Sequence, residues 1–252
     1  MIKKILVFLV LVLNTFCVGN AMYRGRNCMA NTVSGNGKIV SYVNKINGRD
    51  YLLKIDDLSF ISSRGVQIKS TYDDSYQISL TTDENIANTV DIRINEENYV
   101  IEYSSKERIS PTIFLIEIAV PLRGFIGYGS FDFDIFSGVE KFSLNVKGES
   151  NGKVKLNCVD SANICLNGKS NLSLSGHSNS FCMDVSGNVN IDAVNVVSKI
   201  CNVLCAGCGS VKVFSSDLLS LNMRGNWKCG YSGNPKKINK SIEGLCKIQK
   251  IV

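Results

Sequence analysis

The stretch "VLCAGCGSVKV" (203–213) contains one unit of the repeat that decides the fold of this chain. Gly207, near its centre, belongs to a series of glycines that recur along the C-terminal half: Gly148, Gly168, Gly187, Gly207, Gly225 and Gly244. The intervals between them are 20, 19, 20, 18 and 19 residues, which is too even for unrelated loops. A constant period of this length indicates a stack of similar structural units, as in a solenoid protein.

Apolar residues occupy fixed positions before each of these glycines. The second, fourth and sixth positions are apolar in every unit except at Lys240, and the positions between them are mostly Ser and Asn. Alternation with period two predicts strands with one buried face. The predicted inward columns are Val146, Leu166, Val185, Cys205, Met223 and Ile242; Leu144, Ile164, Met183, Val203, Leu221 and Lys240; and Phe142, Ala162, Phe181, Cys201, Leu219 and Ile238.

A second alternating segment follows each glycine, for example "KVKL" (153–156) and "VKV" (211–213). Short strands that turn at glycine predict an all-β fold, a single-stranded parallel β-helix with six coils of about 19 residues over 142–248. Three residues past the glycines stand Asn151, Asn171, Asn190 and Ser210. Two interpretations stay open for these four residues, a side-chain hydrogen-bond ladder between coils or simple turn propensity.

The first half of the chain predicts less regular coils of the same β-helix. Strands are expected at 37–43, 51–61, 66–70, 76–80, 90–94 and 99–103, and a long apolar strand at 111–122 that ends near Pro121. Residues 81–90 predict a short helix or turn, because Asp83 and Asn85 are capping residue types. Nothing in the composition separates two domains, so residues 22–252 are expected to form one β-helical domain.

The first 21 residues have the layout of a secretory signal peptide. Lys3 and Lys4 precede an apolar run (5–16) and the small residues of "VGNA", which predicts cleavage after Ala21 and a mature chain that begins at Met22. The run is shorter than the roughly 20 residues that span a bilayer, and we expect no transmembrane segment in the mature chain. The protein is therefore expected to be exported to the periplasm, the outer surface or the medium.

The net charge gives little support to nucleic-acid binding. Without Lys3 and Lys4, 26 basic residues face 22 acidic ones, a small excess of +4 that is scattered along the chain. The densest basic cluster, "NPKKINKS" (234–241), is typical of a solvated turn.

In its order of motifs the chain resembles the GIN domain, the bacterial domain described as the head of an auto-transporter adhesin. The resemblance rests on "VSGNGKIV" (33–40), "YLLKIDDLSFISSRGVQIKS" (51–70), "TTDENIANTVDIRINEENYVIEY" (81–103), "IAVPLRGFIGYGS" (118–130), the glycine repeats and "MRGNWKCGYSGNPKKINKSIEG" (223–244). It covers about 33–248 and implies a right-handed parallel β-helix in a secreted or envelope protein without established catalytic residues. The turns here depart from the Gly-Ser-Gly-Asp-rich turns of that family and carry added cysteines.

The positions of the cysteines favour a role in core packing over a role as metal ligands. Cys201 and Cys205 fall in inward columns and are expected to be buried free thiols, whereas Cys208 lies just past the glycine corner. A zinc site needs about four convergent ligands, and the chain has a single histidine, His177. Nine cysteines remain after cleavage, an odd number, and disulfides stay open among Cys28, Cys158, Cys165, Cys182, Cys208, Cys229 and Cys246. Of these, Cys208, Cys229 and Cys246 are expected near one corner of the last coils.

Three features of the sequence are candidate sites. "FDFDIF" (131–136) places Asp132 and Asp134 on one face of a strand. Two carboxylates at this spacing fit the acid and base of a polysaccharide-active enzyme, the ligands of a calcium ion, or an ordinary polar face, and the last is favoured. His177 in "GHS" is expected at a turn. Trp227 and Tyr231 fit a sugar-binding platform or the capping of the open solenoid end.

These observations predict an exported envelope or surface protein, an adhesin-like binding or structural module that is not an enzyme. No catalytic, cofactor-binding or metal-binding residues and no cofactors are predicted. The expected partners are an envelope glycan or surface polymer, and a second copy packed side by side. The alternatives are a β-helix polysaccharide-active enzyme and a periplasmic glycan-binding module.

Overall fold

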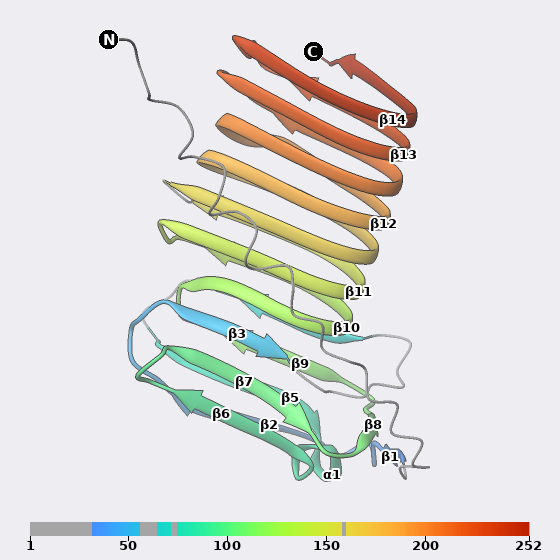
Figure 1. Cartoon of the computed structure of the whole chain (residues 1–252). Helices are drawn as coiled ribbons and strands as arrows, with labels where there is room; N and C mark the ends of the chain where they lie inside the picture. The colour runs from blue at the N-terminus through green and yellow to red at the C-terminus, as the bar shows by residue number, and fades with distance from the viewer. Residues whose placement is uncertain (1–31, 56–64, 72–74, 158–159, 252) are drawn as a thin grey trace, which may run out of the picture. The chain divides into compact units, whose positions relative to one another are not determined.

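Strands stacked in register form the part of the chain that carries the glycine repeat (Figure 1). These strands are β10 (Leu122–Ser137), β11 (Lys141–Asn157), β12 (Ser161–Phe214), β13 (Leu218–Ser232) and β14 (Lys237–Lys250). Each pairs in parallel with the next along the chain, and β12 alone contains three of the repeat glycines. This computed structural model describes residues 32–55, 65–71, 75–157 and 160–251, so the predicted signal peptide (1–21) lies outside it. The predicted β-solenoid is confirmed.

The repeat glycines stack into one column along a corner of the coils, and the column begins one coil earlier than predicted. Gly129 pairs with Gly148, and Gly148 pairs with Gly168. Gly168 has a φ of +136°, and a Cβ there would overlap the carbonyl oxygen of Gly148. Glycine is needed at this corner because the chain turns in a conformation that L side chains rarely adopt, against the backbone of the coil below.

The interior contains the residues that the period-two pattern assigned to it. Phe142, Leu144 and Val146 are at most 1 % exposed, and the equivalent residues of the next four coils are also buried. The last coil differs, because β14 is the terminal strand of the sheet: Lys240 is exposed and Ile242 is 41 % exposed. Lys240, the one polar residue in the predicted inward columns, therefore occupies the open end of the stack.

Below β10, shorter strands continue the two walls of the solenoid. β3 (Tyr51–Ile55) pairs with the first part of β10, and β4 (Val66–Ser70) pairs with its second part. The remaining elements are β7 (Val100–Ser105) and β6 (Val90–Asn95) beyond β3; β9 (Phe114–Ile118), β5 (Gln77–Asp83) and β2 (Ile39–Lys45) beyond β4; and the pair β1 (Thr32–Ser34) and β8 (Arg108–Ser110). The antiparallel pairs β2–β5, β5–β9 and β6–β7 make these coils less regular, as predicted.

Two local expectations meet different outcomes. Residues 111–122 do not form one strand, because β9 ends at Ile118 and β10 begins at Leu122. The chain crosses there from one wall to the other: Pro121 has no N–H for a ladder, and its carbonyl oxygen accepts a hydrogen bond from Tyr51 N at 2.9 Å. The expected short helix is present as α1 (Glu84–Ala87), with Asp83 at its N-cap.

Candidate functional site

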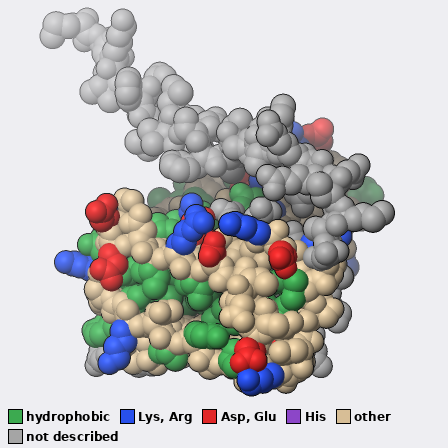
Figure 2. Space-filling view, turned by 90° about the horizontal axis from the view of Figure 1, so that it is seen from below, with side chains coloured by type: hydrophobic (Ala, Val, Ile, Leu, Met, Phe, Trp, Pro, Cys, Tyr) green, Lys and Arg blue, Asp and Glu red, His purple; other side chains and the backbone are tan. Residues whose placement is uncertain are grey.

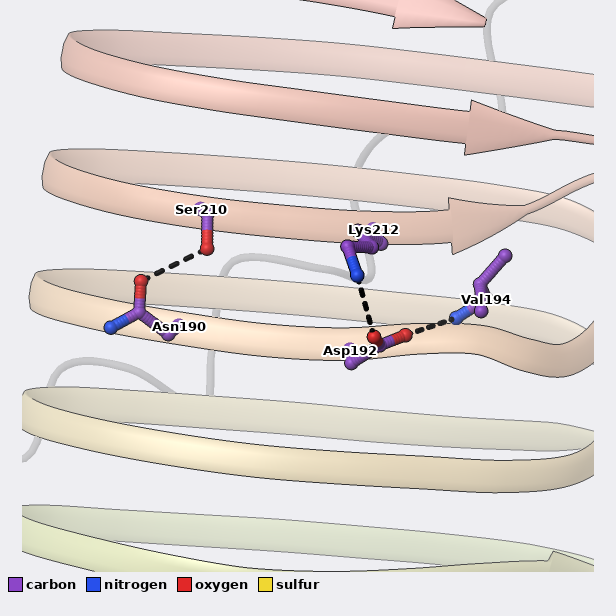
Figure 3. A network of polar contacts seen from close by, with 5 residues as sticks. All are labelled: Asn190, Asp192, Val194, Ser210 and Lys212. Carbon is purple, nitrogen blue, oxygen red and sulfur yellow. Dashed lines mark hydrogen bonds and ion pairs between the residues drawn. The ribbon is translucent and has the colours of Figure 1, made fainter. Parts of the chain in front are cut away.

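A ladder of polar side chains crosses the coils on the outward side of the strands that follow the glycine column. Asn171 Nδ2 donates to Asn151 Oδ1 at 3.1 Å, and Asn190 Nδ2 donates to Asn171 Oδ1 at 3.1 Å. Ser210 Oγ continues the series by donating to Asn190 Oδ1 at 2.9 Å (Figure 3). Of the two interpretations left open by the sequence, the structure shows the ladder. The name post-glycine face is used below for Asn151, Asn171, Asn190 and Ser210 with the outward residues two positions further on, Lys153, Ser173, Asp192 and Lys212.

An ion pair lies beside this ladder. Lys212 Nζ lies 2.9 Å from Asp192 Oδ2, and the other carboxylate oxygen of Asp192 accepts a hydrogen bond from Val194 N at 3.4 Å (Figure 3). Both charged side chains are about half exposed, so solvent screens the pair and its contribution to stability is small. Its effect is to fix the direction of two of the three charges on the post-glycine face, which also carries Lys153.

The outward residues three and five positions before each repeat glycine are nearly uncharged. Their side chains are small, and Asp184 is the only charged one among them. We call this set the pre-glycine face: Ser143, Asn145, Asn163, Cys165, Cys182, Asp184, Asn202, Leu204, Ser220, Asn222, Asn239 and Ser241. Some of its amides also bond across coils, as Asn202 Nδ2 does with Cys182 Sγ at 3.5 Å.

Asp132 and Asp134 lie on the outer surface of β10, as the alternation in "FDFDIF" predicts. Both are exposed, whereas Phe131, Phe133 and Ile135 are at most 4 % exposed. In register, Asp132 lies between Gln67 and Asn151, and Asp134 lies between Lys69 and Lys153. This setting places basic and amide groups directly opposite the two carboxylates. The further carboxylate on β11, Glu149, lies opposite Ser130 and is paired with Lys169 at 3.8 Å.

The aromatic residues near the C-terminal end do not form a surface platform. Trp227 is 1 % exposed, and its Nε1 donates to the carbonyl oxygen of Arg224 at 3.1 Å. Tyr231 is half-buried against the core. Of the two interpretations of this pair, the sugar-binding platform is wrong, because residues two and six positions past the glycine both point inward. His177 is exposed, next to Gly176, whose positive φ of +113° marks a corner of the coil.

Cys201 and Cys205 are buried thiols, as predicted, with 0 % and 4 % exposure. Burial, with a smaller contribution from nearby thiols, raises the pKa of Cys205 to about 12 and that of Cys229 to about 11. The expected corner cluster is wrong for Cys208, which is exposed while Cys229 is buried, because odd and even positions past the glycine face opposite ways. Cys182, Cys208, Cys229 and Cys246 are free thiols, and Cys28 and Cys158 lie outside the described residues.

A buried carboxylate, Asp83, connects three segments of the chain, and no motif in the sequence predicted this role. Asp83 is fully buried, and its Oδ1 accepts hydrogen bonds from Gly37 N at 2.8 Å and from Thr112 Oγ1 at 2.9 Å. Its Oδ2 accepts a third from Thr112 N at 2.7 Å. Burial raises the pKa of Asp83, but these hydrogen bonds outweigh burial, and the net pKa lies below its ordinary value. Only the helix-capping residue type was visible in the sequence, and Asp83 makes no side-chain cap.

Other chemistry is sparse in the described ranges. No group of three or more His, Cys, Asp or Glu side chains among them is arranged to hold a metal ion. No helix in the same ranges has the length and apolar character required to cross a bilayer. Two open hollows, of about 320 and 440 Å³, share Asp50 and Arg123 at the side of the solenoid.

Comparison with known proteins matches most of the chain. The family model described as "Putative auto-transporter adhesin, head GIN domain" matches residues 59–235. A crystal structure named as a "putative adhesin" from Bacteroides fragilis aligns with a TM-score of 0.73 at 16 % identity, over 87 % of this chain and 100 % of its own. A "Putative lipid binding protein" from Parabacteroides distasonis gives 0.63 at 19 % identity, over 88 % and 100 %.

A further "putative adhesin", from Parabacteroides merdae, gives a TM-score of 0.59 at 18 % identity, over 88 % of this chain and 100 % of its own. At these identities the likeness is one of fold. No curated protein sequence matches the chain significantly.

Proposed function

Because this chain belongs to the GIN domain family, whose model spans residues 59–235, we propose that it is an exported adhesin-like module that binds an extended polymer on its post-glycine face. The observation that carries the proposal is the exposed ladder from Asn151 to Ser210. The amides of Asn171 and Asn190 each donate one N–H to the preceding coil, which leaves a second N–H on each for a ligand.

The spacing of the ladder suits a polymer with a regular repeat. Neighbouring coils lie about 4.8 Å apart, so equivalent donors and acceptors recur at that interval along the solenoid. A glycan of the cell envelope offers hydroxyl groups in a similar extended series. Binding would draw on many weak polar contacts along a flat surface, without an enclosing pocket.

The binding test uses an array of purified envelope glycans and surface polymers. Asn171→Ala with Asn190→Ala removes the centre of the ladder, and Asn202→Ala with Asn222→Ala is a matched pair on the pre-glycine face. We expect the first pair to lower the affinity for a polymer bound by the wild type by about tenfold, and the second pair to leave it unchanged. Equal effects of the two pairs would place binding elsewhere.

We further propose that the protein has no turnover. The support is the setting of Asp132 and Asp134, which lie directly opposite basic and amide residues: Lys69, Lys153, Gln67 and Asn151. The third carboxylate of this surface, Glu149, is paired with Lys169. Release of reducing or unsaturated ends from acidic or neutral polysaccharides by the wild type, and its loss in Asp132→Asn with Asp134→Asn, would show the polysaccharide-active alternative to be correct.

Export is tested separately by cell fractionation with sequencing of the N-terminus. The signal-like segment predicts a chain that begins at Met22 outside the cytoplasm. Fractionation also separates surface exposure from periplasmic retention, which imply different glycan partners. Intact Met1 in the exported fraction would contradict the predicted cleavage.

A further inference from the structure

The two ends of the solenoid expose different chemistry. At the C-terminal end, β14 carries four lysines, and Lys240 stands in a core-side position above Leu221. A lysine on the core side of a terminal strand opposes pairing with another chain, because pairing would bury its charge. This end of the stack is therefore protected against association.

Among the described residues, the core side of β6, the terminal strand at the N-terminal end, carries no such charge. Val90, Ile92 and Ile94 are half-buried and lie opposite Ser105, Tyr103 and Ile101 of β7, all of which are buried. Residues that face each other in an antiparallel pair lie on the same side of the sheet, so this apolar row points to the core side. It is incompletely covered.

The same end also exposes apolar residues of β2, the terminal strand of the other wall. Tyr42, on the core side opposite Leu80, is 46 % exposed, and Val43 is 56 % exposed. Seen from below, apolar side chains occupy the middle of this end and charged ones lie mainly around them (Figure 2). An apolar centre with a charged rim is typical of an interaction surface.

The sequence of β6 is complementary to itself. In an antiparallel pair of two β6 strands centred on Ile92, Val90 of one copy faces Ile94 of the other. On the outer side, Asp91 of each copy faces Arg93 of the other, so the pair contains two contacts between opposite charges. Within one chain these two side chains form only an exposed ion pair of 3.5 Å along the strand. β2 has a single charged residue, Lys45, which is the last of the strand.

We propose that two copies of this chain join at their N-terminal ends by antiparallel pairing of β6 with β6 around a twofold axis. The pairing continues the wall of each solenoid into the other. It covers the core-side row of β6 and satisfies the backbone groups of its free edge. The inference does not depend on which polymer the outer faces bind, and it differs from a side-by-side oligomer because those faces stay open.

The test measures the dissociation constant of the purified protein by sedimentation equilibrium at low ionic strength. We expect the wild type to be a dimer. Asp91→Arg and Arg93→Asp each place like charges opposite each other at two symmetric positions, which should raise the dissociation constant about tenfold or more. The side chain of Arg93 is 67 % exposed and that of Asp91 is 59 % exposed. Their substitution should therefore leave the fold, and with it the circular dichroism spectrum, unchanged.

Two combinations of these substitutions test whether the strands pair antiparallel and centred on Ile92. The double variant Asp91→Arg with Arg93→Asp restores opposite charges at both positions and should dimerise like the wild type. A mixture of the two single variants should form heterodimers, since each strand then faces its complement. Only an antiparallel pair centred on Ile92 gives this pattern.

The matched control reverses another exposed pair, Lys169–Glu149, which lies 3.8 Å apart in the middle of the solenoid. Lys169→Glu should leave dimerisation unchanged. A monomeric wild type at all concentrations would overturn the proposal, and so would a dimer that the β6 single variants do not weaken. Protection from hydrogen exchange, in a monomer, of the β6 amides that point away from β7 would also overturn it, because the edge would then be covered by this chain's own residues.

Discussion

Leu221 and Asn222 are adjacent in the chain, but Leu221 is 2 % exposed and Asn222 faces solvent. Leu221→Asp places a carboxylate in the core, where a charge without a partner is strongly disfavoured. We expect Leu221→Asp to lower the free energy of unfolding by about 3 kcal/mol or more, whereas Asn222→Asp should change it by less than about 0.5 kcal/mol. Thermal melting followed by circular dichroism compares the two, and equal losses would contradict the assignment of inward and outward positions.

We expect the cysteines to differ in reactivity, because some of their side chains point into the core and others point to solvent. Burial raises the pKa of Cys205 to about 12 and that of Cys229 to about 11, so both stay protonated at neutral pH, whereas Cys208 is exposed. We expect a thiol reagent at pH 8 to label Cys208 rapidly and the two buried thiols only on unfolding. Mass spectrometry of peptides after brief labelling identifies the sites. Rapid modification of Cys205 in the folded protein would refute its burial.

At the scale of single elements, the ladder joins neighbouring coils through side chains as well as backbone. Asn171 both donates to Asn151 and accepts from Asn190, so Asn171→Ala removes two hydrogen bonds. These bonds compete with water at an exposed site, so we expect Asn171→Ala to lower the free energy of unfolding by about 1 kcal/mol. Asn167→Ala, at an exposed position on the other side of the same coil, is the control for thermal melting. A smaller loss for Asn171→Ala than for the control would show that the ladder does not stabilise the stack.

Asp83 joins β5 and α1 to the segments around Gly37 and Thr112, and this connection depends on pH. Its pKa is lowered in the folded state, so its contribution to stability is present above the ordinary value of 3.8 and is lost as the pH falls through the lower folded value. Asp83→Asn should reduce the melting temperature at neutral pH and flatten its decrease between about pH 5 and pH 2. Asp132→Asn, at an exposed site, should leave both unchanged. If the melting temperature of Asp83→Asn decreases toward low pH as steeply as that of the wild type, Asp83 does not have this role.

Elements with a strict period were predictable, and elements fixed by distant contacts were not. The six glycines and the alternation around them defined the coils, because every repeat unit carries the same pattern of buried positions. The break between β9 and β10 was missed, since "FLIEIAVPL" (114–122) is apolar apart from Glu117 and the crossing depends on distant hydrogen bonds such as that between Pro121 and Tyr51. The site showed the same contrast: the Asn151 to Ser210 column was visible, whereas the bonds of Asp83 to Gly37 and Thr112 join residues far apart in sequence.

On the scale of the whole molecule, each coil pairs only with the coils directly before and after it. Stability is then close to a sum of coil and interface terms. Deletion of residues 169–187 removes one repeat and leaves Gly168 in the place of Gly187. We expect this shortened chain to keep its β-sheet circular dichroism spectrum and a cooperative melt.

Deletion of only residues 169–177 is the matched control, because it removes about half a coil and interrupts the glycine column. We expect that chain to aggregate or to lose its cooperative melt, since inward residues would face solvent. Equivalent behaviour of the two deletions would show that the coils are not interchangeable units.

The stacking of β14 on β13 also determines how the molecule responds to force. Strands lie across the long axis of the stack, and the hydrogen bonds between coils lie along it. A pull on the C-terminal end therefore loads the bonds of β14 one after another, beginning at Lys250, instead of all together. The coils should yield in succession at low force, each exposing about 19 residues of slack, while the coil beneath remains as a template for rewinding.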